Sequence, residues 1–182
     1  LPLLPLQILW INLVTDGLPG LALALEQAED DTMRRPPYPP KQHIFSRGMG
    51  RDIAWIGLLM GVVSLSVGYW WWAVGSASEA HWRTIIFTVL TLTQMGNALA
   101  TRSARDSLFR IGIFSNRALI SSVALTFGLQ LGVIYWPPLQ SIFKTTALTG
   151  VELLSCIAMS TIVFWAIEAQ KFFLRAGRET SL

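Results

Sequence analysis

Five apolar stretches, separated by polar connections, set the pattern of this chain. A helix needs about 20 apolar residues to cross the hydrocarbon core of a bilayer, and each stretch has close to that length. The first contains one formal charge, Asp16, and the third has only Arg83 at its edge. The pattern predicts an all-α, polytopic bundle of five transmembrane helices. The predicted spans cover residues 1–25, 53–74, 82–100, 118–136 and 146–167.

Composition favours the same class. Hydrophobic residues make up 52% of the 182 residues and charged residues only 14%, whereas soluble domains average about 25% charged residues. A soluble all-α domain with buried helices is the alternative, but five such runs in one short chain argue against it. Because Leu1 already lies inside an apolar run, we expect the chain to be part of a longer protein.

The basic residues predict which connections face the cytoplasm. Twelve of the fourteen Lys and Arg residues follow the first, third or fifth span, and cytoplasmic segments carry such an excess. Loops 26–52 and 101–117 and the C-terminal tail are therefore predicted to be cytoplasmic, with residue 1 on the outer side and residue 182 inside. The run Pro36–Pro40 favours a stiff, extended connector within the first loop.

The first span carries three oxygen-bearing side chains. On a helix, Asn12, Thr15 and Asp16 have the spacing of one face. A carboxylate in the middle of a membrane costs about 2.5–3.5 kcal/mol even on mild scales, so something must offset it. A bound cation is the expected counter-charge, and all-oxygen ligands suit hard cations such as Ca²⁺, Mg²⁺, Na⁺ or K⁺.

The same span also contains helix breakers. Pro19 removes the amide that would bond the Thr15 carbonyl, and Gly17 and Gly20 lower the resistance to unwinding. We therefore predict that the first span is unwound at Gly17–Pro19, as in transporters whose broken helices present carbonyls to cations. The alternative is a Pro-kinked helix in which a protonated or hydrogen-bonded Asp16 joins helices.

Other polar residues in the spans have more ordinary explanations. Gln94 and Asn97 face the same way on the third predicted helix and either complete the cation site or join helices. Glu152 and Glu168 lie near the predicted interfaces and are interpreted as structural. The sequence contains neither a Gly-rich phosphate loop followed by Lys-Ser/Thr nor a Ser/His/Asp set. Any ATP hydrolysis must therefore use residues outside this chain.

Two segments resemble a known family. "LQILWINLVTDGLPGLALALEQAEDDTMRRPPYPP" resembles the sixth membrane helix and following loop of P-type cation-transporting ATPases, most closely the calcium-pump-like branch, and "TQMGNALATRS" resembles the eighth helix. The resemblance implies that residues 1–182 form the C-terminal transmembrane domain. It also implies that Asn12, Thr15 and Asp16 coordinate the transported ion, with Gln94 as a further candidate.

The resemblance further implies partners outside the chain. These are upstream membrane helices and cytoplasmic ATPase domains that bind ATP and Mg²⁺ and carry a phosphorylated Asp. The lipid bilayer is the remaining partner, and no nucleic acid is expected. The short outer loop, residues 75–81, favours a prokaryotic plasma membrane over animal reticulum.

Two positions bear on the ion. Two-site calcium pumps carry an acidic residue where this chain has Gln94, which favours one Ca²⁺ per cycle. Sodium–potassium pumps resemble the chain at Gln94 but typically carry Asp where it has Asn12. Ca²⁺ is therefore the expected ion, with Mn²⁺ and Na⁺/K⁺ as alternatives. The rival classes are a passive channel or secondary transporter and a non-transporting membrane scaffold.

Overall fold

The structure, a computed structural model, describes residues 2–26, 49–75, 78–103 and 107–179, and every regular element in these ranges is helical. This confirms the predicted all-α class. The elements are α1 (Pro5–Trp10), the π-helix η1 (Ile11–Asp16), α2 (Gly17–Leu23), α3 (Met49–Gly75), α4 (Glu79–Ala100), α5 (Leu108–Ile111), the 3-10 helix η3 (Ile113–Ser115), α6 (Arg117–Tyr135), α7 (Pro137–Phe143) and α8 (Gly150–Glu179).

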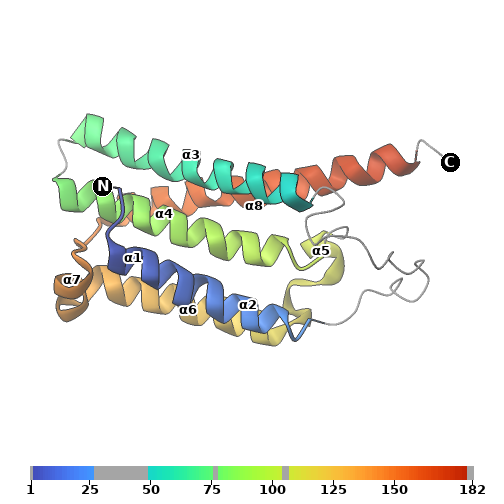
Figure 1. The fold of residues 1–182 in the computed structure, drawn as a ribbon, viewed down its shortest axis with the longest axis horizontal. Helices are drawn as coiled ribbons and strands as arrows, with labels where there is room; N and C mark the ends of the chain where they lie inside the picture. The colour runs from blue at the N-terminus through green and yellow to red at the C-terminus, as the bar shows by residue number, and fades with distance from the viewer. Residues whose placement is uncertain (1, 27–48, 76–77, 104–106, 180–182) are drawn as a thin grey trace.

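The long helices lie side by side and run alternately along one axis (Figure 1). The first predicted span is formed by α1, η1 and α2 stacked end to end, and it lies beside α6. Helices α3, α4 and α8 pack against one another, while α4 also contacts α6 and η1. Helix α4 therefore joins the two halves of the bundle. A long helical segment lies at each of the five predicted spans.

Four of these segments are long and apolar enough to cross a membrane by length and composition: Pro5–Leu23, Met49–Ala73, Arg117–Tyr135 and Gly150–Phe173. Helix α4 is the fifth, and it is more polar because it lies inside the bundle. Its threonines 84, 88, 91 and 93 are all buried. Thr84 and Thr88 donate to the carbonyls of Ala80 and Thr84, both at 2.8 Å, which satisfies their hydroxyls within the helix.

Apolar side chains from α3, α4 and α8 fill the main core. Ile85 and Val89 of α4 and Val163 of α8 are fully buried there. Helices α3 and α4 approach closely at Gly68, where an added Cβ would lie 2.2 Å from Ile86 Cγ1. A side chain at this position would collide with the neighbouring helix.

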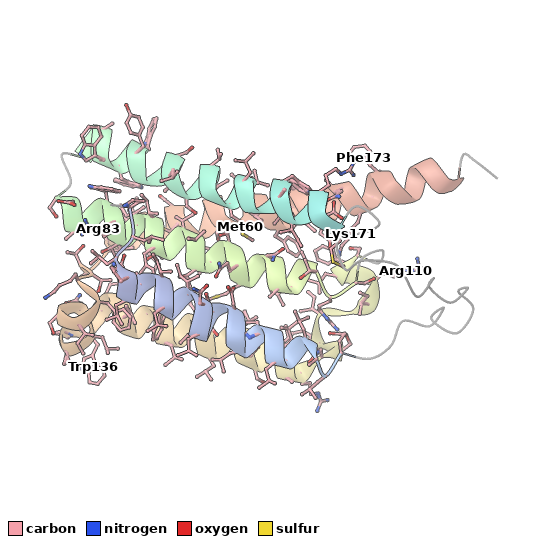
Figure 2. All side chains as sticks on the ribbon, in the orientation of Figure 1. Met60, Arg83, Arg110, Trp136, Lys171 and Phe173 are labelled. Atoms are coloured by element: carbon pink, nitrogen blue, oxygen red, sulfur yellow. The ribbon has the colours of Figure 1, made fainter. Side chains whose placement is uncertain are left out.

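Basic residues lie toward both ends of the bundle. Figure 2 shows Arg83 and Trp136 near one end, and Arg110 and Lys171 near the other. This arrangement agrees with the alternation from which sidedness is predicted. Loop 101–117 contains α5 and η3. Most of loop 26–52, including Pro36–Pro40, lies outside the described residues.

The interruption of the first span differs from the prediction in form and position. Gly17–Pro19 is not unwound, because α2 begins at Gly17 and has helical dihedral angles there. The irregular segment is instead η1, directly before it. Pro19 is the third residue of α2, so the N–H that it lacks would face the carbonyl groups of η1, at the junction where the helix type changes. Its missing N–H is therefore tolerated, and the change of helix type takes up the break.

A candidate cation site on the first span

The π-helix η1 carries three of the predicted site residues. A π-helix has wider turns than an α-helix and occurs mostly as short insertions, often at functional sites. Thr15 is buried, and its Oγ1 lies 2.6 Å from the carbonyl oxygen of Ile11 and 2.6 Å from Oε1 of Gln94. The structure thus joins two of the four predicted residues, one on η1 and one on α4.

The other two predicted residues point elsewhere. Asn12 and Asp16 are exposed on the surface of the chain, whereas Thr15 points into the bundle. The prediction that all three share one face assumed an α-helix, and burial separates them in η1. Within this short segment the hydroxyl of Thr15 is thus covered by the bundle, whereas the side chains of Asn12 and Asp16 are open to groups outside the described chain.

The end of the first span that precedes η1 is held by neutral hydrogen bonds. Gln7 is fully buried, accepts from Leu4 N at 3.0 Å and donates to the Phe143 carbonyl at 3.1 Å. Trp10 donates its indole N–H to Gln130 Oε1 at 3.0 Å. These contacts anchor the span to α6 and α7. The roles of Gln7 and Trp10 were not predicted from the sequence, although a glutamine within an apolar span was a signal available for Gln7.

An ion pair holds the opposite end of the span. Arg102 donates to both carboxylate oxygens of Glu26, at 2.9 and 2.7 Å, and its side chain is 1% exposed. Asn116 caps α6 by accepting from Leu119 N and also donates to Glu26 at 2.8 Å. The hydrogen bond from Arg102 holds the pKa of Glu26 below its usual value, with Asn116 acting in the same direction and partial burial opposing them. From the sequence, Arg102 counts only among the basic residues that predict the cytoplasmic side.

The donor set around η1 consists of oxygen-bearing side chains. No cluster of three or more His, Cys, Asp or Glu residues suited to a metal occurs in the described part of the chain. Hydroxyl, amide and carboxylate groups at Thr15, Gln94, Asn12 and Asp16 match hard cations rather than thiophilic metals. Asn97 lies on α4 beyond Gln94, and its Oδ1 is buried without a partner among the described residues.

Membrane-length helices with an interruption beside polar groups are typical of ion-transport proteins, and comparison with known proteins points to the same class. Residues 1–173 match the family model for the C-terminus of cation-transporting ATPases. The chain belongs to this family, as the C-terminal membrane region of a P-type cation ATPase.

Several curated relatives are similar over most of the chain. It is 41% identical over 162 residues to a calcium-transporting ATPase of Bacillus subtilis, covering 89% of this chain and 18% of that protein. It is 35% identical over 175 residues to calcium-transporting ATPase 1 of Yarrowia lipolytica, covering 96% and 19%. It is 34% identical over 162 residues to human calcium-transporting ATPase type 2C member 1, covering 89% and 18%. The chain thus spans about a fifth of the length of these relatives.

Proposed function

We propose that this chain is the membrane part of an ATP-driven pump that exports Ca²⁺. The family match and the names of the calcium-transporting relatives support this assignment. Phosphorylation, ATP and Mg²⁺ belong to cytoplasmic domains outside the chain. A prokaryotic plasma membrane is the proposed location, supported by the similarity to the Bacillus subtilis protein.

We further propose that η1 carries the transported ion, with Asn12, Thr15, Asp16 and Gln94 as ligands. The observation that carries this proposal is the contact between Thr15 and Gln94, because the exposed Asp16 directly follows Thr15 in the chain. A carboxylate on a membrane-spanning helix is costly against lipid. Asp16 therefore faces protein or a cation in the intact ATPase. Upstream helices would cover Asn12 and Asp16 and complete the ligand set.

The charge of the ligands favours a single Ca²⁺. Gln94 is neutral, and Asp16 is the only acidic residue among the four proposed ligands. One carboxylate here, together with an acidic ligand from an upstream helix, would balance one divalent cation. These ligands leave no carboxylate for a second Ca²⁺. A second ion would therefore bind weakly, because the affinity of a Ca²⁺ site rises with the number of charged ligands. Mn²⁺ is the alternative ion with the same charge.

The proposed mechanism is alternating access driven by phosphorylation. Phosphorylation of the cytoplasmic domain shifts the membrane helices between inward- and outward-open states. Asp16 binds the cation in the first state and releases it in the second. A π-helical turn is suited to this role because small shifts at such a turn change which carbonyls and side chains face the site. The last two spans mainly support it.

The experiment is Ca²⁺-stimulated phosphorylation of the intact ATPase carrying Asp16→Asn. The proposal expects this variant to lose Ca²⁺-stimulated phosphorylation while being produced and inserted normally. The matched control is Asp52→Asn, the same change at a residue that accepts from Gln170 at 2.8 Å on α8, and it should retain activity. Normal transport by Asp16→Asn would refute the ion site. Cation flux without ATP would favour the channel or secondary-transporter alternative.

A further inference from the structure

Buried polar atoms without a hydrogen-bond partner mark a second feature of the bundle. Among the described residues, four buried side-chain atoms have no hydrogen-bond partner: Thr91 Oγ1, Asn97 Oδ1, Thr126 Oγ1 and Gln130 Nε2. Thr91 and Thr126 are 0% exposed and Gln130 is 1% exposed. Native proteins rarely leave such groups unpaired. Because the chain itself covers these three residues, a helix from elsewhere in the protein cannot reach them.

The orientation of the Gln130 amide is fixed by its neighbour. The Trp10 indole N–H can only donate, and it lies 3.0 Å from Oε1 of Gln130. The amide oxygen must therefore face Trp10. The Nε2 group, with two hydrogens to donate, faces away from Trp10 and needs an acceptor.

Helix register places Thr91 at the level of Gln130, with Thr126 one turn away on α6. Thr126 and Gln130 are four residues apart on α6 and share a face. Phe87 of α4 and Val133 of α6 lie in the same small core cluster with Ile11. Because α4 and α6 run in opposite directions (Figure 1), one turn from Phe87 toward Thr91 corresponds to one turn from Val133 back to Gln130.

The chemistry of the three groups selects the ligand. A cation needs oxygen lone pairs and is repelled by the two N–H hydrogens of Gln130. A water molecule accepts a hydrogen bond from Nε2 and can exchange hydrogen bonds with both threonine hydroxyls, since each is a donor and an acceptor. Buried waters typically make about three such bonds to groups that are otherwise unsatisfied. We propose that α4 and α6 hold a buried water bound by Thr91, Thr126 and Gln130.

This water would help to hold the residues around the candidate cation site in place. Through Gln130 it fixes the indole of Trp10, the residue directly before η1. Through Thr91 it holds the helix that presents Gln94, three residues further on. Gln130, Thr91 and Thr126 are thus positioning residues for the cation site. This role rests on the proposed function, whereas the presence of the water does not.

The first test is a high-resolution structure of the intact ATPase. The expected result is density for a water within hydrogen-bond distance of Gln130 Nε2 and the hydroxyls of Thr91 and Thr126. The same experiment on Thr126→Val should show the water weakened or lost with the helices in place. A direct bond from Gln130 Nε2 to a protein group, with no water between, would overturn the proposal.

The second test measures the Ca²⁺ dependence of ATP hydrolysis in Thr126→Val. We expect the Ca²⁺ concentration for half-maximal activity to rise about two- to tenfold, the range of one net hydrogen bond, with little change in maximal rate. The matched control is Thr161→Val, because Thr161 is exposed and bonds only the Ala158 carbonyl of its own helix. An unchanged Thr126→Val would overturn the positioning role. If Asp16→Asn also transports normally, the proposed cation site is refuted. The proposal of a buried water is then tested only by the density in the high-resolution structure.

Discussion

The hydroxyl of Thr15 lies 2.6 Å from the side-chain oxygen of Gln94, which is 79 residues further along the chain. This contact links the π-helical segment of the first span to the helix at the centre of the bundle. The contact is partly buried, and the exposed Asp16 directly follows Thr15 in the chain. A change in the position of η1 is therefore transmitted directly to α4.

A double-mutant cycle tests this link. Thr15→Val keeps the shape of the side chain and removes its hydroxyl, and Gln94→Leu removes the amide. We expect each variant to weaken Ca²⁺ activation of the intact ATPase, and the double variant to lose about 0.5–1.5 kcal/mol less than the sum. Strictly additive losses would show that the two side chains act independently. Thr15→Ser is the control and should retain most of the affinity.

Close packing of α3 on α4 predicts a sharp difference between glycines. Gly68→Ala would place a Cβ 2.2 Å from Ile86 Cγ1, and such overpacking costs about 1–3 kcal/mol. At Gly61 an added Cβ meets no atom within 4 Å. Thermal unfolding of the intact ATPase should therefore shift downward for Gly68→Ala and remain unchanged or rise slightly for Gly61→Ala. Equal midpoints for the two variants would contradict this packing.

The Glu26–Arg102 pair predicts a dependence on pH. Because Arg102 lowers the pKa of Glu26 in the folded protein, the ionised carboxylate favours folding. Its contribution is complete above the ordinary glutamate value of about 4.3 and is lost as the pH falls through the lowered pKa of the folded state. Glu26→Gln should therefore destabilise the ATPase at neutral pH and reduce the further loss of stability below about pH 4.3. Thermal midpoints of the wild type and of Glu26→Gln, measured against pH, check both effects. If the two proteins lost stability in parallel as the pH fell, the ion pair would not contribute to acid unfolding.

Glu152 is expected to act on stability rather than transport. It is buried and accepts hydrogen bonds from Thr149 N at 2.7 Å and Thr149 Oγ1 at 2.8 Å, and its other oxygen lies 2.7 Å from His81 Nε2. Glu152→Ala should cost about 1–3 kcal/mol of stability and leave Ca²⁺ affinity unchanged. Glu79→Ala is the control, because the Glu79 side chain is 68% exposed and its ion pair with Arg83, like other exposed pairs, contributes at most about 1 kcal/mol. A selective loss of Ca²⁺ affinity in Glu152→Ala would require a direct role in the cation site.

Hydropathy and charge predicted the main elements because both follow directly from the cost of placing groups in a membrane. All five predicted spans have a helical counterpart, and α4 was predicted correctly despite its polar residues. The form of the break in the first span was not predictable. Gly17 and Pro19 indicate a weak point, but whether the chain unwinds or widens into η1 depends on packing against α4 and α6.

The candidate site was only partly predictable for the same reason. The spacing of Asn12, Thr15 and Asp16 identifies an oxygen-rich segment, but it does not show that Thr15 turns inward to Gln94. Contacts such as that of Trp10 with Gln130 join residues 120 positions apart, and no local sequence pattern predicts them. Short helices α5 and α7 were also missed, because four to seven residues are too few to establish a period.

Equilibrium binding of radioactive Ca²⁺ to the purified intact ATPase tests the central claim most directly. The account predicts about one bound Ca²⁺ per wild-type molecule, a count set by the ligand charge, and none in Asp16→Asn. Asp52→Asn should bind as the wild type does. Binding by Asp16→Asn with unchanged affinity and stoichiometry would contradict the assignment of the transported ion to the π-helical segment of the first span.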